Sequence, residues 1–364
     1  MKLFAASFFM FAALLLLGSG CQTQKSDAKA ENNAKEMDGA VNYVNEGEKH
    51  FKNVVMLTDA GENAEAYWGF TEKKLTFQSK TGDLECDQIF VMNLDGTGKQ
   101  MISNGKGRTT CAYFLPGDSL VVYASTHHNG DACPPEPDRS KGYVWQLYNT
   151  YDIFVSNLAG EIVGQLTNSP GYDAEATVSP LGDKIVFTST RDGDPEIYVM
   201  DLDGSNQKRL THAKGYDGGP FFSPDGQKIV FRASRPTTPE ELADYKDLVE
   251  LDYVRPTALE IYVMDADGSN ITQITNFGKA SFAPYFHPDG QRIIFSSNIN
   301  SASGRDFDIY MINIDGTGLE QLTVNETFDG FPMFTRDGKH LVFASNRNNK
   351  NPGDTNIFLA EWVE

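Results

Sequence analysis

Short apolar runs, each bounded by turn-forming residues, recur along the chain from about residue 50 to the end. Residues 172–211 contain four of them in order: DAEATVS, KIVFTST, EIYVMDL and QKRLT. The connections between the first and second runs, and between the third and fourth, carry Gly in tight turns such as Asp-Gly, which suit hairpins. In KIVF and IYVM the apolar residues are consecutive, so both faces of these strands are expected to be covered. The pattern predicts antiparallel four-stranded units.

The four-stranded unit repeats along the chain. The phrase IYVMDLDGSN at residues 197–206 returns as IYVMDADGSN at 261–270, and SPLGDKIVFTS at 179–189 returns as SPDGQKIVFRAS at 223–234. Looser copies bring the number of repeats to six, and the tightest spacing, from Gly182 to Gly226, is 44 residues. A period of this length suits the blades of a β-propeller.

The two ends of the folded region complement each other. The last repeat stops at AEWVE without a fourth strand, whereas FKNVVMLTDAG at residues 51–61 resembles a fourth strand with no repeat of its own. We therefore predict an all-β protein: a six-bladed β-propeller, residues 50–364, closed by an N-terminal strand that completes the last blade. Residues 54–58 should lie beside residues 356–362, which removes exposed sheet edges.

The SPDGxxIVFxSxR and IYVMDxDGSNxxxLT phrases resemble the WD40-like PD40 repeats of the TolB propeller, over residues from about 50 to the end. The resemblance implies the propeller fold, which hosts many activities. TolB carries an additional N-terminal α/β domain, for which the sequence before residue 50 leaves only a short tether. The partnership of TolB with the peptidoglycan-associated lipoprotein is therefore not carried over.

The N-terminal segment predicts export. Residues 1–20 have one Lys, an apolar run and small residues, as in a signal peptide. Cys21 after Gly-Ser-Gly resembles a lipoprotein cleavage site, which implies lipidation of Cys21 and, with Gln22 next, an outer-membrane lipoprotein. Residues 21–49 are polar and predict a flexible tether. Plain secretion is the alternative.

The formal net charge of −19 makes nucleic acid an unsuitable partner. It favours a basic protein face, a basic ligand or a metal cation.

The irregular segments gather on one face of the predicted propeller. The connections after second and fourth strands lie on that face, and two long insertions, 126–152 and 234–260, belong to it. A short helix is predicted at PEELADYKDLVE because Pro239 precedes two Glu residues. Four irregular loops on one face predict a binding surface.

Asp173, Asp217 and Asp329 recur at matching positions near the predicted channel mouth. They form either a ring of carboxylates, which would hold a divalent cation or a basic group, or caps of their own turns. Arginines near this face are able to pair with them or to bind an anion. No other cofactor is predicted.

The cysteines of an exported protein usually pair. Cys111–Cys133 is the predicted disulfide, because it would pin the first insertion beside the strand it leaves, and Cys86 is left over. A thiol site with His127 and His128 matches no zinc spacing.

Tyr143, Trp145, Tyr148 and Tyr151 either anchor a peptide or glycan or pack the insertion onto its blade. The chain has no G-x-S-x-G or H-E-x-x-H motif. We therefore expect a lipid-anchored, non-catalytic envelope module that binds a protein, peptide or glycan, with a metal-assisted hydrolase or lyase as the alternative. The candidate ligand-binding residues are Arg108, His127, His128, Trp145, Tyr172, Asp173, Glu175, Tyr216, Asp217, Arg235, Arg255, Asp329 and Arg347.

Overall fold

The computed structural model describes residues 41–364 of the chain. The predicted signal peptide (1–20), the predicted lipidation site Cys21 and residues 21–40 of the predicted tether lie outside the described residues. Within residues 41–364 no helix combines the length and the apolar character needed to span a bilayer.

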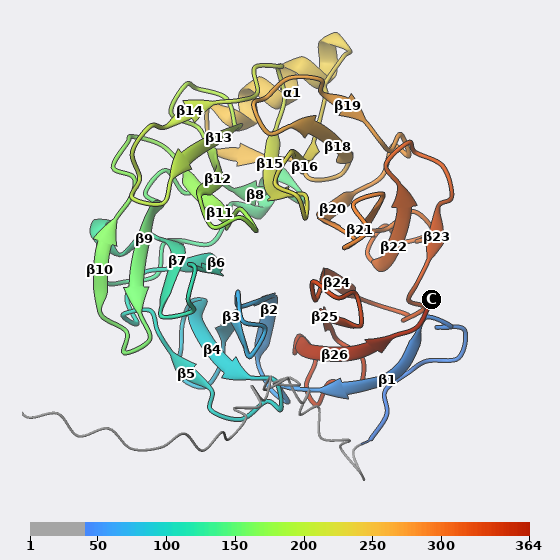
Figure 1. Ribbon diagram of the computed structural model, residues 1–364. Coiled ribbons are helices and arrows are strands. Elements are labelled where there is room, and N and C mark those ends of the chain that lie inside the picture. The colour runs from blue at the N-terminus through green and yellow to red at the C-terminus, as the bar shows by residue number, and fades with distance from the viewer. Residues whose placement is uncertain (1–40) are drawn as a thin grey trace, which may run out of the picture. The chain divides into compact units, whose positions relative to one another are not determined.

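Six four-stranded antiparallel sheets surround a common axis, as Figure 1 shows. The six-bladed β-propeller predicted from the sequence is confirmed. Blades 1 to 3 consist of β2 (Glu62–Trp68), β3 (Lys74–Lys80), β4 (Gln88–Asn93) and β5 (Gln100–Met101); β6 (Thr109–Phe114), β7 (Leu120–Ser125), β9 (Asp152–Asn157) and β10 (Ile162–Gln165); and β11 (Asp173–Val178), β12 (Lys184–Ser189), β13 (Glu196–Asp201) and β14 (Lys208–Arg209).

The remaining three blades follow the same order from the axis outward. They consist of β15 (Asp217–Phe222), β16 (Lys228–Ala233), β18 (Glu260–Asp265) and β19 (Thr272–Gln273); β20 (Ser281–Phe286), β21 (Arg292–Ser297), β22 (Asp308–Asn313) and β23 (Glu320–Gln321); and β24 (Asp329–Phe334), β25 (His340–Ser345), β26 (Asn356–Trp362) and β1 (Phe51–Met56). The outermost strand of blade 6 is thus the first strand of residues 41–364.

One hydrogen-bonded arrangement fixes the outer strand of every blade. In blade 3, Thr211 donates its hydroxyl proton to Glu196, the first residue of the third strand. Blade 6 repeats this with Thr58, which donates to Asn356 at 3.1 Å and accepts the backbone N–H of Ile357 at 2.9 Å. The Thr or Ser of the repeated L-T phrase plays this part in the other blades as well. The register of β1 on β26 is therefore that of a fourth strand.

Residues 41–49, assigned to the tether from the sequence, and the adjoining His50 pack on blade 6. Arg347 donates to both carboxylate oxygens of Glu48, at 2.8 and 3.0 Å, and Glu48 is buried. The His50 ring stacks on Trp362, with centroids 4.8 Å apart. The packed region thus begins before the predicted boundary at residue 50.

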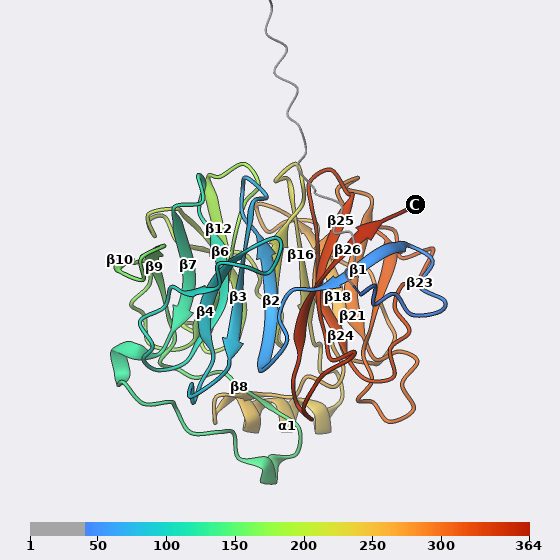
Figure 2. The ribbon, with the colours of Figure 1, turned by 90° about the horizontal axis from the view of Figure 1, so that it is seen from below.

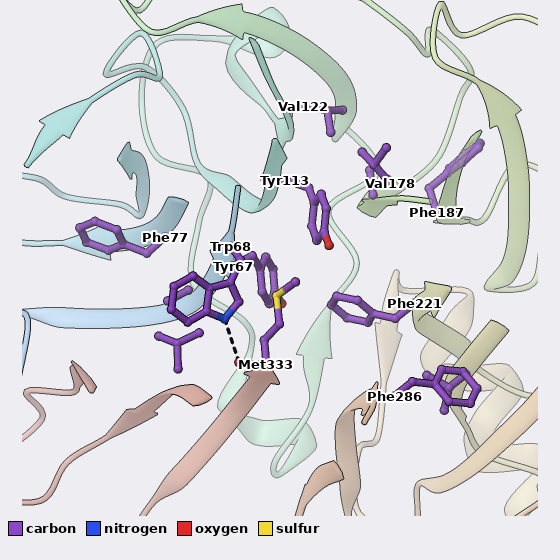
Figure 3. Close-up of a cluster of buried hydrophobic side chains, with 14 of the residues drawn as sticks. Tyr67, Trp68, Phe77, Tyr113, Val122, Val178, Phe187, Phe221, Phe286 and Met333 are labelled. Carbon is purple, nitrogen blue, oxygen red and sulfur yellow. Dashed lines mark hydrogen bonds between the residues drawn. The ribbon is translucent and has the colours of Figure 1, made fainter. Parts of the chain in front are cut away.

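Aromatic side chains fill the axis. Tyr67 of blade 1 contacts Phe221 of blade 4, with ring centroids 5.5 Å apart, and these blades stand opposite each other in the ring. Tyr113 and Tyr285 extend the group, and Figure 3 shows the Tyr113 hydroxyl pointing toward the centre. We call Tyr67, Tyr113, Phe221 and Tyr285 the aromatic plug. Its rings contact one another across the axis.

Candidate functional site

We call the end of the ring with the connections after second and fourth strands the loop face, and the other end the turn face. On the loop face the two long insertions meet. β8 (Trp145–Gln146) of the first insertion pairs antiparallel with β17 (Tyr253–Val254) of the second. Figure 2 shows β8 and α1 (Pro239–Val249) together beyond one end of the ring. We call the paired insertions the lid.

Local sequence features build the lid. The predicted helix is confirmed as α1: its N-cap, Thr238, accepts the N–H of Glu241, and Glu241 accepts the N–H of Thr238. This reciprocal arrangement satisfies backbone donors that the first turn of a helix leaves unpaired. The lid packs on blades 2 to 4 through a buried cluster that includes Leu147, Tyr245 and Val254.

The predicted Cys111–Cys133 disulfide is wrong, because the structure pairs Cys86 with Cys133 and leaves Cys111 as a free thiol. Cys111 belongs to β6, where its side chain lies within hydrogen-bond reach of Glu65. Cys86 lies in the loop of the neighbouring blade 1, next to Asp87, whose carbonyl accepts from Thr109. The bridge therefore ties the first insertion to the adjacent blade.

The three recurring aspartates form buried ion pairs within their own blades. Asp173 accepts from Arg191 at 2.8 Å, and Asp329 accepts from Arg347 at 2.7 Å. Asp217 forms an ion pair with Arg235. The carboxylates are thus neutralised one by one. Within residues 41–364 no group of three or more His, Cys, Asp or Glu side chains is arranged to hold a metal ion.

The other candidate residues contact neighbours of their own. Arg108 pairs with Glu136 at 2.7 Å, and Arg255 pairs with Asp244 of α1 at 2.9 Å. The imidazoles at positions 127 and 128 both pack on the Phe154 ring, with centroids 4.4 and 4.7 Å away. These side chains stabilise the lid and its attachment.

A polar cluster lies beneath the lid where four predicted residues converge: Trp145, Tyr172, Glu175 and Tyr216. Glu175 pairs with Arg232 and accepts from the Gly219 backbone N–H at 2.8 Å. Arg232 also donates to the Tyr216 hydroxyl at 2.7 Å, and its guanidinium lies 5.2 Å from the centroid of the Trp145 ring. Arg232 Nε is buried and has no hydrogen-bond partner among the described residues.

Two positions that sequence reasoning left out of the site, Glu65 and Cys111, share one backbone feature with the predicted Glu175. The innermost strand of every blade is interrupted by a bulge, and the residue at that bulge has a positive φ in all six blades. In chain order these residues are Glu65, Cys111, Glu175, Gly219, Ala283 and Phe331. Aligning the six repeats on the innermost strand would have brought Glu65 and Cys111 into register with Glu175.

Glu65 is the most perturbed acid of this cluster. Burial raises its pKa to about 7, and the nearby Glu175 adds to the shift. Its Oε2 is buried without a hydrogen-bond partner among residues 41–364. Burial also raises the pKa of the Cys111 thiol well above its ordinary value. The cluster therefore holds a protonatable carboxyl beside an ion pair, under a protein cover.

Residues 136–238 and 238–359, together more than half of the chain, match PD40, the TolB β-propeller domain. The chain belongs to this family. A putative TolB from Agrobacterium tumefaciens superposes with a TM-score of 0.55 at 19% identity, over 84% of this chain and 91% of that protein. TolB from Acinetobacter baumannii gives 0.53 at 18% identity, over 83% of this chain and 64% of its own length.

The fold is also shared with enzymes. A gluconolactonase from Xanthomonas campestris superposes with a TM-score of 0.55 at 15% identity, over 86% of this PD40 chain and 91% of the lactonase. At these identities the likeness is one of fold, and the activity has to be argued from the site.

Proposed function

We propose that this PD40 propeller is a non-catalytic binding module of the bacterial cell envelope that recognises a protein partner through the lid. Attachment to the outer membrane through a lipid on Cys21 is part of the proposal. The observation that carries it is the pairing of β8 with β17, which joins insertions from two non-adjacent blades into one surface.

Several independent structural features hold the lid in place. Two-residue strands are marginal by themselves, yet these are held by the Cys86–Cys133 bridge, the capped helix α1 and the buried Leu147 cluster. The surface so ordered leaves large apolar side chains exposed. Tyr143, Leu242 and Leu251 are 65%, 40% and 47% exposed. Exposed aromatic and aliphatic anchors on an ordered surface are typical of protein interfaces.

Charge narrows the class of partner. The insertions 126–152 and 234–260 contain eleven Asp and Glu residues but five Lys and Arg residues. An acidic surface attracts a basic one and speeds encounter. The kinship with TolB propellers supports protein binding in general. We therefore propose a partner with a basic face.

The test compares two double variants of the full chain. One variant, Tyr143→Ser with Leu251→Ser, alters the lid. The other, Ile271→Ser with Leu319→Ser, alters two apolar residues outside the lid that are each 41% exposed. Each protein, anchored in its native membrane, is cross-linked and its partners are quantified. We expect the lid variant to lose about tenfold or more of the partner, as for interface anchors, and the control to retain it. Equal recovery by both variants would refute the lid as the recognition surface.

A second candidate function is an enzyme whose site is the cluster beneath the lid. The raised pKa of Glu65, about 7, suits a general acid or base. This function requires the lid to open for substrate. Turnover of a sugar lactone, the class of substrate of a gluconolactonase, that disappears in Glu65→Gln while the variant still melts cooperatively would favour the enzyme over the binding module.

A further inference from the structure

A cavity of about 340 Å³ opens at the turn face, on the far side of the aromatic plug from the lid. It lies where the innermost strands end, and Trp68, Tyr113, Tyr285 and Met333 form part of its wall. Figure 3 shows the Trp68 indole, whose N–H donates to the Met333 carbonyl at 3.0 Å and is thereby satisfied. The volume of the cavity falls at the lower end of the range for small-molecule sites, about 300–1,000 Å³.

The rim of this cavity carries a positive charge at one blade. In blades 3, 4 and 5 the first turn supplies a proline to the rim: Pro180, Pro224 and Pro288. Blade 6 places Arg336 at the corresponding position of its TRDG turn. A cation therefore replaces an apolar ring at one point of an otherwise largely apolar rim.

Among residues 41–364 the Arg336 guanidinium has no carboxylate partner. Among the arginines whose side chains the structure describes, all except Arg305 and Arg336 form ion pairs. Arg336 is exposed and lies over the Phe70 ring, 5.2 Å from its centroid. In a chain of net charge −19, an unpaired arginine on a cavity rim is available for an outside anion.

Glu72 limits the charge of that anion. Its Oε1 accepts the backbone N–H of Arg336 at 2.6 Å, so a carboxylate lies at the base of the Arg336 side chain. A ligand with two negative charges would be repelled by it, whereas a single carboxylate is able to take the planar fork of the arginine.

We propose that the turn-face cavity binds a small monocarboxylate with an aromatic or aliphatic body. Arg336 holds the carboxylate at the rim, and the body enters between Trp68, Tyr285 and Met333. Burial of the apolar body supplies affinity, and the charge-assisted hydrogen bonds supply orientation. The site is independent of the proposed function, because the lid lies on the opposite face.

The experiment titrates the full chain with 3-phenylpropionate and with its neutral amide, 3-phenylpropionamide, by ligand-observed NMR. Arg336→Ala removes the guanidinium, and Arg336→Lys keeps the charge but not the planar fork. Arg305→Ala is a matched control, since Arg305 likewise forms no ion pair among the described residues. Thermal melting of each variant checks the fold. A change at Arg336 should leave melting nearly unchanged, because its side chain is exposed and unpaired.

We expect saturable binding of the carboxylate with a Kd of about 1 mM or tighter, given the size of the probe. Loss of a charge-assisted pair lowers the affinity about tenfold to a hundredfold. We therefore expect that loss of affinity in Arg336→Ala, a smaller loss in Arg336→Lys and none in Arg305→Ala. The proposal would be overturned if the amide bound as well as the carboxylate or if binding did not saturate. It would also be overturned if Arg336→Ala bound like the wild type or if Arg305→Ala lost as much affinity.

Discussion

The indole of Trp145 lies over the guanidinium of Arg232, with 5.2 Å between the ring centroid and the guanidinium carbon. Trp145 belongs to the first insertion and Arg232 to the second strand of blade 4. The same indole contacts Tyr216 and Phe282 edge to face. One lid residue therefore joins three blades and shields the ion pair of Arg232 with Glu175 from water.

Trp145→Ala should loosen the lid. Loss of a partly buried indole and its cation–π contact is expected to lower the free energy of unfolding by about 1–3 kcal/mol, as measured by urea denaturation. Hydrogen exchange of residues 143–149 and 251–256 should rise together. Tyr143→Ala is the control, since that ring is 65% exposed. Faster exchange in only one of the two segments would contradict a shared lid.

Thr58→Val tests the closure of the ring. The change keeps the size of the side chain but removes the hydrogen bonds to Asn356 and Ile357. We expect a loss of about 1–3 kcal/mol, because a buried backbone N–H loses its partner. Thr211→Val is the matched control in blade 3, whose four strands follow one another along the chain. A loss near zero for Thr58→Val would argue against β1 as the outer strand of blade 6.

Glu65 makes stability depend on pH with a definite sign. Its pKa is about 7 in the fold, above the ordinary value of 4.5. Between these two values the folded state holds a proton that the unfolded state has released, so the free energy of unfolding falls as pH rises through this window. Above pH 7 the contribution stays at its least favourable level.

Glu65→Gln replaces the protonated acid by a neutral amide and should flatten this part of the profile. We expect the difference between variant and wild type to grow by about 1–3 kcal/mol from pH 5 to pH 8. Asp308, whose pKa burial raises to about 7, keeps its own slope of the same sign in both proteins. Parallel profiles for variant and wild type would contradict the burial of Glu65 and its raised pKa.

Cys133→Ser should release the first insertion from blade 1. Loss of a bridge that spans 47 residues is expected to cost about 2–4 kcal/mol and to expose residues 127–144 to limited proteolysis. Cys111→Ser removes a thiol that forms no bridge and serves as the control. Peptide mapping without reductant should recover Cys86 linked to Cys133. Recovery of Cys111 linked to either of them would contradict the structure.

The repeat made the fold predictable, because every blade has the same pattern of strands and turns. The apolar runs gave the inner strands, and the orphan VVMLT phrase at residues 54–58 gave the strand that now lies on β26. The helix at Pro239 followed from its capping residues. These features depend on residues close in sequence, or on comparison with another copy of the repeat.

The lid and the disulfide depended on contacts between blades. β8 and β17 have two residues each and are separated by more than a hundred positions, so neither carries a recognisable strand pattern. Cys133 pairs with Cys86 of the adjacent blade, although Cys111 is nearer in the sequence. Backbone hydrogen bonds of Gly107 and Thr109 bring the two loops together. Arg232 was missed because it occupies an otherwise ordinary strand position.

The pairing of the two insertions into one lid is tested most directly by a cysteine cross-link. Gln146 and Tyr253 are direct partners in the β8–β17 pair, and Cα atoms of such partners lie within the reach of a disulfide, about 4.5–5.5 Å. In a Cys111→Ser background, Gln146→Cys with Tyr253→Cys should form an intramolecular bridge on mild oxidation, while Gln146→Cys with Ile271→Cys should not. Absence of the bridge in the first pair, or its equal formation in the second, would contradict the lid.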